Sequence, residues 1–171
     1  ALYHLGFDEV AEQAMITNIT AEIIRDYIKN HPHIRPVLSS SCPAIVRLVQ
    51  VRFPSLLPNL LLVESPMSML AKYYRDKIVQ EKGYSEEEIG IFLIVPSASQ
   101  VTAVHQPEGN YKHLHNGAIA INEVYNRVMG MLKELEDDPR PIKSYANGLS
   151  WALSGMEAEE VAGKGIETLA I

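Results

Sequence analysis

Apolar side chains recur every three or four residues in four stretches of the chain, a spacing that places them on one face of a helix. The pattern predicts helices over residues 17–29, 43–53, 66–82 and 122–136. Proline or glycine follows each stretch, as is typical of helix ends. Asn18 and Ser41 are the expected caps of the first two helices, because their side chains can accept a hydrogen bond from a free N–H of the first turn.

Shorter apolar runs lie between the predicted helices and indicate strands. The run 89–95 is typical of a buried strand, and weaker patterns predict strands over 8–14 and 36–38. The order strand, helix, strand, helix at the start of the chain predicts an α/β fold with a mostly parallel sheet flanked by helices. We expect residues 1–171 to form a single domain.

Composition narrows the class of protein. Of the 171 residues, 47% are hydrophobic and 21% are charged, which is enough apolar material for a buried core. A formal net charge of −6 argues against binding to nucleic acid or to anionic membranes, because both need clustered Lys and Arg. No apolar run approaches the roughly 20 residues of a transmembrane helix, and a single cysteine excludes an internal disulfide framework. We therefore expect a cytoplasmic protein.

The single cysteine lies in the stretch Ser39-Ser40-Ser41-Cys42-Pro43, between a predicted strand and a predicted helix. Pro43 suits the first helical turn, so Cys42 is expected beside the free amides of a helix N-terminus. Those amides favour an anion and make a thiol a better nucleophile or metal ligand. A lone cysteine is more often a small buried hydrophobic residue, and both interpretations stay open. A cysteine protease would also need a histidine that nothing in the sequence places beside Cys42.

Other polar residues give weaker signals. Ser97 follows the strongest predicted strand, and since ligands gather at the carboxyl ends of parallel strands, Cys42 and Ser97 are expected to share one rim of the sheet. His113 and His115 have a spacing compatible with a metal, but two ligands are too few, and a solvated pair is the commoner outcome. The acidic run 157–160 is typical of a solvated face and is assigned no role. Dinucleotide-binding, P-loop and serine-hydrolase motifs are absent from the sequence.

Four motifs, spread over nearly the whole chain, all resemble motifs of the same protein family. They are Ser39-Ser40-Ser41-Cys42-Pro43-Ala44 with its continuation to Pro66, Val95-Pro96-Ser97-Ala98-Ser99-Gln100, Asn116-Gly117-Ala118-Ile119 and Gly148-Leu149-Ser150-Trp151. The chain resembles the iron-only hydrogenase large subunit, whose members have Thr-Ser-Cys-Cys-Pro at the first motif and Met-Pro-Cys-x-x-Lys at the second. The resemblance implies two α/β lobes that hold the hydrogen-activating iron–sulfur cofactor, the H-cluster, in the cleft between them. This chain would correspond to roughly one lobe.

The departures from the family pattern concern the residues that hold the cluster. The resemblance implies that Cys42 is a retained, vestigial iron ligand and possible metal site, and that Ser41 replaces a cysteine that relays protons. It also implies that Ser97 replaces the next ligand cysteine and that Gln100 replaces a lysine that contacts the cluster. A serine hydroxyl is a poor substitute for a thiolate on an iron–sulfur cluster. We therefore expect no cofactor in this chain alone and no hydrogen catalysis by it.

Three hypotheses follow from this resemblance. The chain is a degenerate or regulatory hydrogenase-like domain, since residues 47–53 resemble those of sensory, signalling-linked members more closely than those of catalytic ones. Alternatively, it is a fragment whose third motif, Cys-x-x-Gly-Cys in the family, follows Ile171; the abrupt start and end of the chain favour this expectation. The third hypothesis is a metal-free protein-interaction module that binds a protein partner, the missing second lobe or a second copy of the chain.

Overall fold

The computed structural model describes residues 1–107, 114–133, 135, 145–162 and 166–169, and not the side chains of 146 and 147. Contacts divide the chain into two compact units. The first unit comprises residues 1–12 and 71–144, and the second comprises residues 13–70 and 145–171. The long helix α3 (Pro66–Lys82) contributes residues to both. The prediction that residues 1–171 form one domain stays a prediction.

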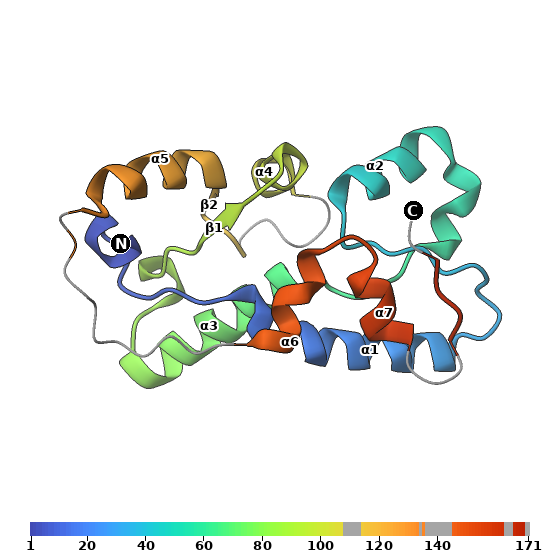
Figure 1. The fold of residues 1–171 in the computed structure, drawn as a ribbon. Helices are drawn as coiled ribbons and strands as arrows, with labels where there is room; N and C mark the ends of the chain where they lie inside the picture. The colour runs from blue at the N-terminus through green and yellow to red at the C-terminus, as the bar shows by residue number, and fades with distance from the viewer. Residues whose placement is uncertain (108–113, 134, 136–144, 163–165, 170–171) are drawn as a thin grey trace. The chain divides into compact units, whose positions relative to one another are not determined.

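The first unit contains a parallel β-α-β arrangement. Strands β1 (Phe92–Val95) and β2 (Gly117–Ala120) pair in parallel, in a register that runs from Phe92 opposite Gly117 to Val95 opposite Ala120. Helix α4 (Ala98–His105) lies between them in sequence and packs on both, and α5 (Ile121–Met131) starts directly after β2 (Figure 1). This confirms the α/β class and the parallel direction of the sheet, although the paired strands are not the ones from which a parallel sheet was predicted.

Polar contacts of α3 and the residues after it brace the first unit. Arg75 donates to the carbonyl oxygens of Glu86 at 2.9 Å and of Leu114 at 3.2 Å. A short 3-10 helix, Glu86–Glu88, is capped by Ser85, whose N–H and hydroxyl both donate to the carboxylate of Glu88 at 2.9 Å. Another 3-10 helix, Leu2–Leu5, opens the chain.

The second unit is built around α1 (Thr17–Asn30), which packs against α7 (Met156–Ala162) (Figure 1). Its core contains these buried side chains: Ala21, Ile24, Ile28, Leu61 and Val161. Helix α2 (Pro43–Arg52), α6 (Ala146–Leu149) and 3-10 helices at Gln13–Met15, Pro54–Asn59 and Ser150–Ala152 complete the unit. The apolar face of α1 therefore packs against α7, a helix near the C-terminal end of the sequence.

Close packing explains one glycine in this unit. A Cβ atom built on Gly148 in α6 would overlap the carbonyl oxygen of Ala14 and lie 2.5 Å from Thr17 Oγ1. Thr17 is itself buried and donates to that carbonyl at 3.1 Å. Gly148 is therefore required because backbone approaches backbone here.

The helix predictions are confirmed for α1, α2 and α3. Helix α5 begins one residue earlier than predicted, and the predicted end at residue 136 lies outside the described residues. The predicted caps are wrong, because Ile16 precedes α1 and Cys42 precedes α2. Pro43 takes the first helical position, which moves the cap from Ser41 to the residue next to the proline.

The strand predictions are less accurate than the helix predictions. Residues 8–14 form no strand, since the segment pairs with no other strand in the described part of the chain, and 36–38 makes a single parallel bridge between Leu38 and Leu60. Run 89–95 is a strand only over its second half, and β2 was not predicted. Within the described residues, no helix is both long and apolar enough to span a bilayer.

Candidate functional site

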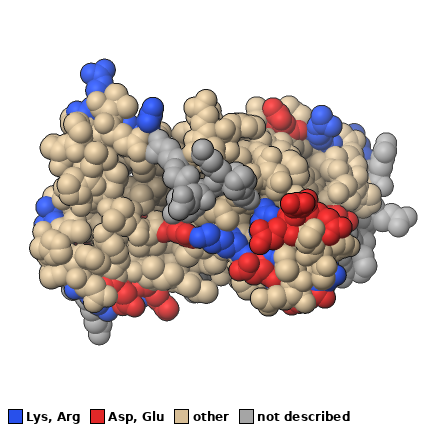
Figure 2. Space-filling model, turned by 180° about the vertical axis from the view of Figure 1, so that it is seen from behind, with Lys and Arg blue, Asp and Glu red and all other residues tan. Residues whose placement is uncertain are grey.

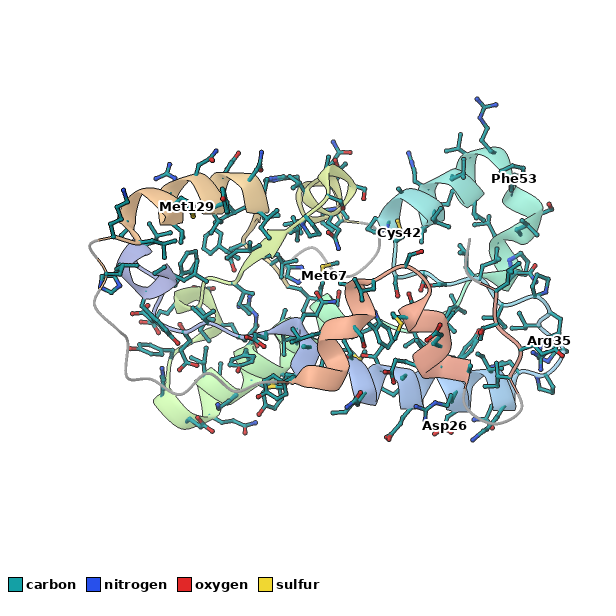
Figure 3. The ribbon with its side chains drawn as sticks, in the orientation of Figure 1. Asp26, Arg35, Cys42, Phe53, Met67 and Met129 are labelled. Carbon is teal, nitrogen blue, oxygen red and sulfur yellow. The ribbon has the colours of Figure 1, made fainter. Side chains whose placement is uncertain are left out.

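The turn that contains Cys42 is fixed on both sides by backbone structure. Leu38 donates its N–H to the carbonyl of Asn59 and accepts from the N–H of Leu61, both at 2.8 Å. On the other side, the carbonyl of Cys42 accepts the first hydrogen bonds of α2, from the N–H groups of Ile45 and Val46 at 3.1 Å. Cys42 adopts an extended conformation, with φ −100° and ψ 111°, and leads into the helix (Figure 3).

The thiol of Cys42 is exposed, so the interpretation of this residue as a buried hydrophobic side chain is wrong. Its side chain makes no capping hydrogen bond to α2. The predicted position beside the free amides of a helix N-terminus is confirmed.

Glu157 joins this turn from the first turn of α7. The hydroxyls of Ser39 and Ser41 both donate to the same oxygen, Glu157 Oε1, at 2.7 and 2.8 Å. The N–H of Ser41 also donates to Ser39 Oγ at 3.1 Å, which closes the turn. The sequence offered no signal for this contact because the partners lie 116 and 118 residues apart. Glu157 is half-buried, so the prediction of a solvated acidic run is wrong at this residue.

Ser97 is the N-cap of α4. Its Oγ accepts from the N–H of Gln100 at 3.4 Å, donates to Gln100 Oε1 at 3.1 Å, and lies 3.1 Å from Ser99 Oγ. Serine is among the favoured residues at an N-cap. The hydroxyl at the position where the resemblance implies a ligand thiol is thus engaged within its own turn.

The structure brings the predicted site residues together in two groups. Ser41 and Cys42 lie in the second unit, and Ser97 and Gln100 lie in the first. A shared rim for Cys42 and Ser97 stays a prediction, since the two residues belong to different units.

Histidines add no metal centre in the described residues, where no group of three or more His, Cys, Asp or Glu side chains could hold a metal. His113 lies outside the described residues. His31 is half-buried; its ring stacks on Tyr27 with centroids 4.2 Å apart, and its Nδ1 lies 2.8 Å from the Tyr27 carbonyl oxygen.

The donors in this chain do not suit a cluster held by four thiolates. The sequence contains a single thiol, and the second position implied by the resemblance is a hydroxyl engaged as a helix cap. Such an oxygen is hard and normally protonated, whereas iron–sulfur clusters are held by soft thiolates.

A parallel β-α-β unit with helices packed on it makes the chain an α/β protein. Residues 1–137 match the family model described as "Iron only hydrogenase large subunit, C-terminal domain". The chain belongs to this family, as its motifs indicated.

Solved structures show the same fold. A variant of apo [FeFe]-hydrogenase HydA1 from Chlamydomonas reinhardtii with one cysteine replaced by histidine matches with a TM-score of 0.66 and 21% identity. A glutamate-to-alanine variant of the same hydrogenase gives 0.66 and 22%, and HydA(deltaEFG), from a study of stepwise H-cluster assembly, gives 0.65 and 22%. Each match covers 85% of this chain and 40% of the other, so the chain spans two-fifths of the length of these structures. No curated protein matches the sequence.

Proposed function

We propose that this chain is a hydrogenase-family domain that does not turn over hydrogen with its own residues and has a sensing or regulatory role. The observation that supports the proposal most strongly is that the Ser97 side chain caps α4. A ligand position of the family holds a hydroxyl whose hydrogen bonds are made within the α4 cap. A residue that has become part of a helix cap serves the fold instead of a metal.

A longer parent chain would not restore the full ligand set. A downstream Cys-x-x-Gly-Cys motif, if it follows Ile171 as the fragment hypothesis requires, would add two thiols to Cys42. The position of Ser97 would still lack one. Sequencing the parent gene beyond Ile171 decides whether that motif exists.

Anaerobic reconstitution with iron and sulfide tests the proposal. We expect substoichiometric iron, no stable iron–sulfur absorption bands and no hydrogen turnover, because one thiol cannot complete a four-thiolate site. A stoichiometric cluster that oxidises or evolves hydrogen would refute the proposal.

A metal-free interaction module is the second candidate, and the exposed face of α5 favours it. Ile121, Tyr125, Met129 and Leu132 are 53%, 60%, 48% and 48% exposed, and they recur at helical spacing. The apolar residues Val124, Val128 and Met131 of the same helix are half-buried. The apolar arc of α5 is therefore wider than the part that its own unit covers (Figure 3 labels Met129). Most of the face shown in Figure 2 is uncharged.

A second copy of the chain is the occupant that this stripe fits. A two-fold axis perpendicular to the helix would pair two such helices antiparallel, with Tyr125 facing Met129 and Ile121 facing Leu132 of the other copy. Four side chains are far fewer than the roughly 20–30 residues a side of a stable interface, so the association should be weak and concentration-dependent. Sedimentation velocity over a concentration series should show dimers that Tyr125→Glu removes and Arg127→Glu, on the polar face of α5, retains. A strict monomer at high concentration would contradict this second candidate.

A further inference from the structure

Glu157 connects the C-terminal helix of the second unit to the turn before Cys42. Its Oε1 accepts two hydroxyl hydrogen bonds, at 2.7 Å from Ser39 and 2.8 Å from Ser41. Hydrogen bonds to an ionised carboxylate are shorter and stronger than those between neutral groups. We propose that Glu157 is a positioning residue that holds the Ser39–Ser41 turn against α7 and so sets the place of the Cys42 thiol.

The backbone hydrogen bonds that fix this segment lie at its two ends. Glu157 can therefore control the position of the turn between them. Leu38 is paired with the segment around Leu60, and the carbonyl of Cys42 belongs to the hydrogen-bond ladder of α2. Between these fixed points, the hydroxyls of Ser39 and Ser41 make their long-range hydrogen bonds, in the described part of the chain, to Glu157. The Ser41 N–H bonds locally, to Ser39 Oγ at 3.1 Å. Loss of the carboxylate would therefore release the turn, while Leu38 and α2 stay in place.

Helix α7 is anchored independently of Glu157. Val161 is buried in the core cluster with Ala21 and Ile24 of α1. Arg25 Nη2 donates to the carbonyl oxygen of Glu160 at 3.3 Å. A substitution at Glu157 should thus leave α7 docked, which separates the local effect on the turn from a general loss of structure.

This inference deepens the proposed function, because the Cys42 turn is the motif that the family uses for its cofactor. It does not depend on whether iron binds. The test uses metal-free, chelator-treated protein, whereas the proposed function is judged by reconstitution. A failure of the positioning role of Glu157 can therefore be distinguished from a failure of the proposed function.

The test measures the rate of backbone hydrogen exchange in a peptide covering residues 36–42 of the folded protein, because the Cys42 thiol is already exposed and its alkylation does not report opening of the turn. Glu157→Ala should raise the rate about fivefold, the ratio that corresponds to about 1 kcal/mol for a lost hydrogen bond. Glu157→Gln keeps an oxygen that can accept both hydroxyls and should stay within about twofold of the wild type. Glu159→Ala is the matched control, since it removes the same charge from an exposed position of the same helix.

Two further measurements keep the test decisive. The rate at which iodoacetamide alkylates Cys42, the single thiol of the chain, should differ between Glu157→Ala and wild type, because the thiol is held in a different place. The double variant Ser39→Ala, Ser41→Ala should raise the exchange rate as much as Glu157→Ala, and adding Glu157→Ala to it should change nothing more. Equal rates in Glu157→Ala and wild type, or an equal increase in Glu159→Ala, would overturn the proposal. If Glu157→Ala does not fold, the serine variants decide the same question.

Discussion

Ser97 holds a position where its hydroxyl stabilises the start of α4. It accepts from the N–H of Gln100 and donates to the Gln100 side chain, so donor and acceptor capacity are both used. At a helix start this satisfies an amide that otherwise has no partner in the helix. A thiol at the same place is a weak hydrogen-bonding group, so a serine here suits a role in the fold.

Replacing Ser97 tests this role. Ser97→Ala should lower the free energy of unfolding by about 1 kcal/mol, the usual cost of losing an N-cap side chain. Ser97→Cys should lower it by a similar amount, whereas Ser97→Asp should retain it, because aspartate caps well and its charge suits a helix N-terminus. Urea unfolding monitored by circular dichroism measures all three. Equal stability of Ser97→Ala and wild type would show that the cap has no energetic role.

Two exposed side chains give stability a pH dependence with opposite signs. Hydrogen bonds from the N–H and hydroxyl of Ser85 hold the pKa of Glu88 below its ordinary value. The hydrogen bond and charge of Glu9, at 2.6 Å, raise the pKa of Lys82 above its ordinary value. Stability from Glu88 is therefore present above its unfolded pKa and is lost as the pH falls through the folded value. Stability from Lys82 is present below its unfolded pKa and is lost as the pH rises through the folded value.

Two variants, each compared with wild type, separate the loss of stability at low pH from the loss at high pH. The stability difference between wild type and Glu88→Gln should shrink as the pH falls below the ordinary carboxyl value of 4.5. The difference between wild type and Lys82→Met should shrink as the pH rises past 10.5. Urea midpoints measured across both ranges check this, and differences that do not change with pH would contradict it.

At the scale of elements, long periodic helices were predictable and short pieces were not. Helix α3 was clear from the sequence because a proline starts it and a glycine ends it. Strand β2 escaped because it has four residues and continues directly into α5, so its apolar residues merged with the helical pattern. Segment 8–14 has a strand-like pattern but pairs with no strand among the residues that the structure describes, and a strand exists only where another can pair with it.

Two glycines in helices should respond to alanine with opposite changes in stability, because only Gly148 in α6 is closely packed. Gly148→Ala should lower the free energy of unfolding by about 1–3 kcal/mol, because the new methyl group would overlap the Ala14 backbone. Gly130→Ala in α5 meets nothing within 4 Å and should raise stability by about 0.5–1 kcal/mol, because alanine favours the helix. Thermal or urea unfolding of the two variants provides the comparison. A stable Gly148→Ala variant would show that the packing is looser than described.

At the scale of the whole molecule, the family could be recognised from motifs, and the arrangement around them could not. The first motif identified Cys42, yet the contact of Ser39 and Ser41 with Glu157 depends on a fold that brings distant segments together. The helix-start position of Cys42 followed from Pro43, a local signal, and was correct. The solvent exposure of its thiol depends on tertiary packing, which no local pattern specifies.

The central claim is that the residues of this chain cannot hold the cofactor of the family. The most direct measurement is iron and sulfide per chain after anaerobic reconstitution, made side by side on wild type and Cys42→Ser. The account predicts the same substoichiometric iron in both and no hydrogen turnover in either. A stoichiometric cluster in the wild type that disappears in Cys42→Ser would contradict it, with or without hydrogen turnover.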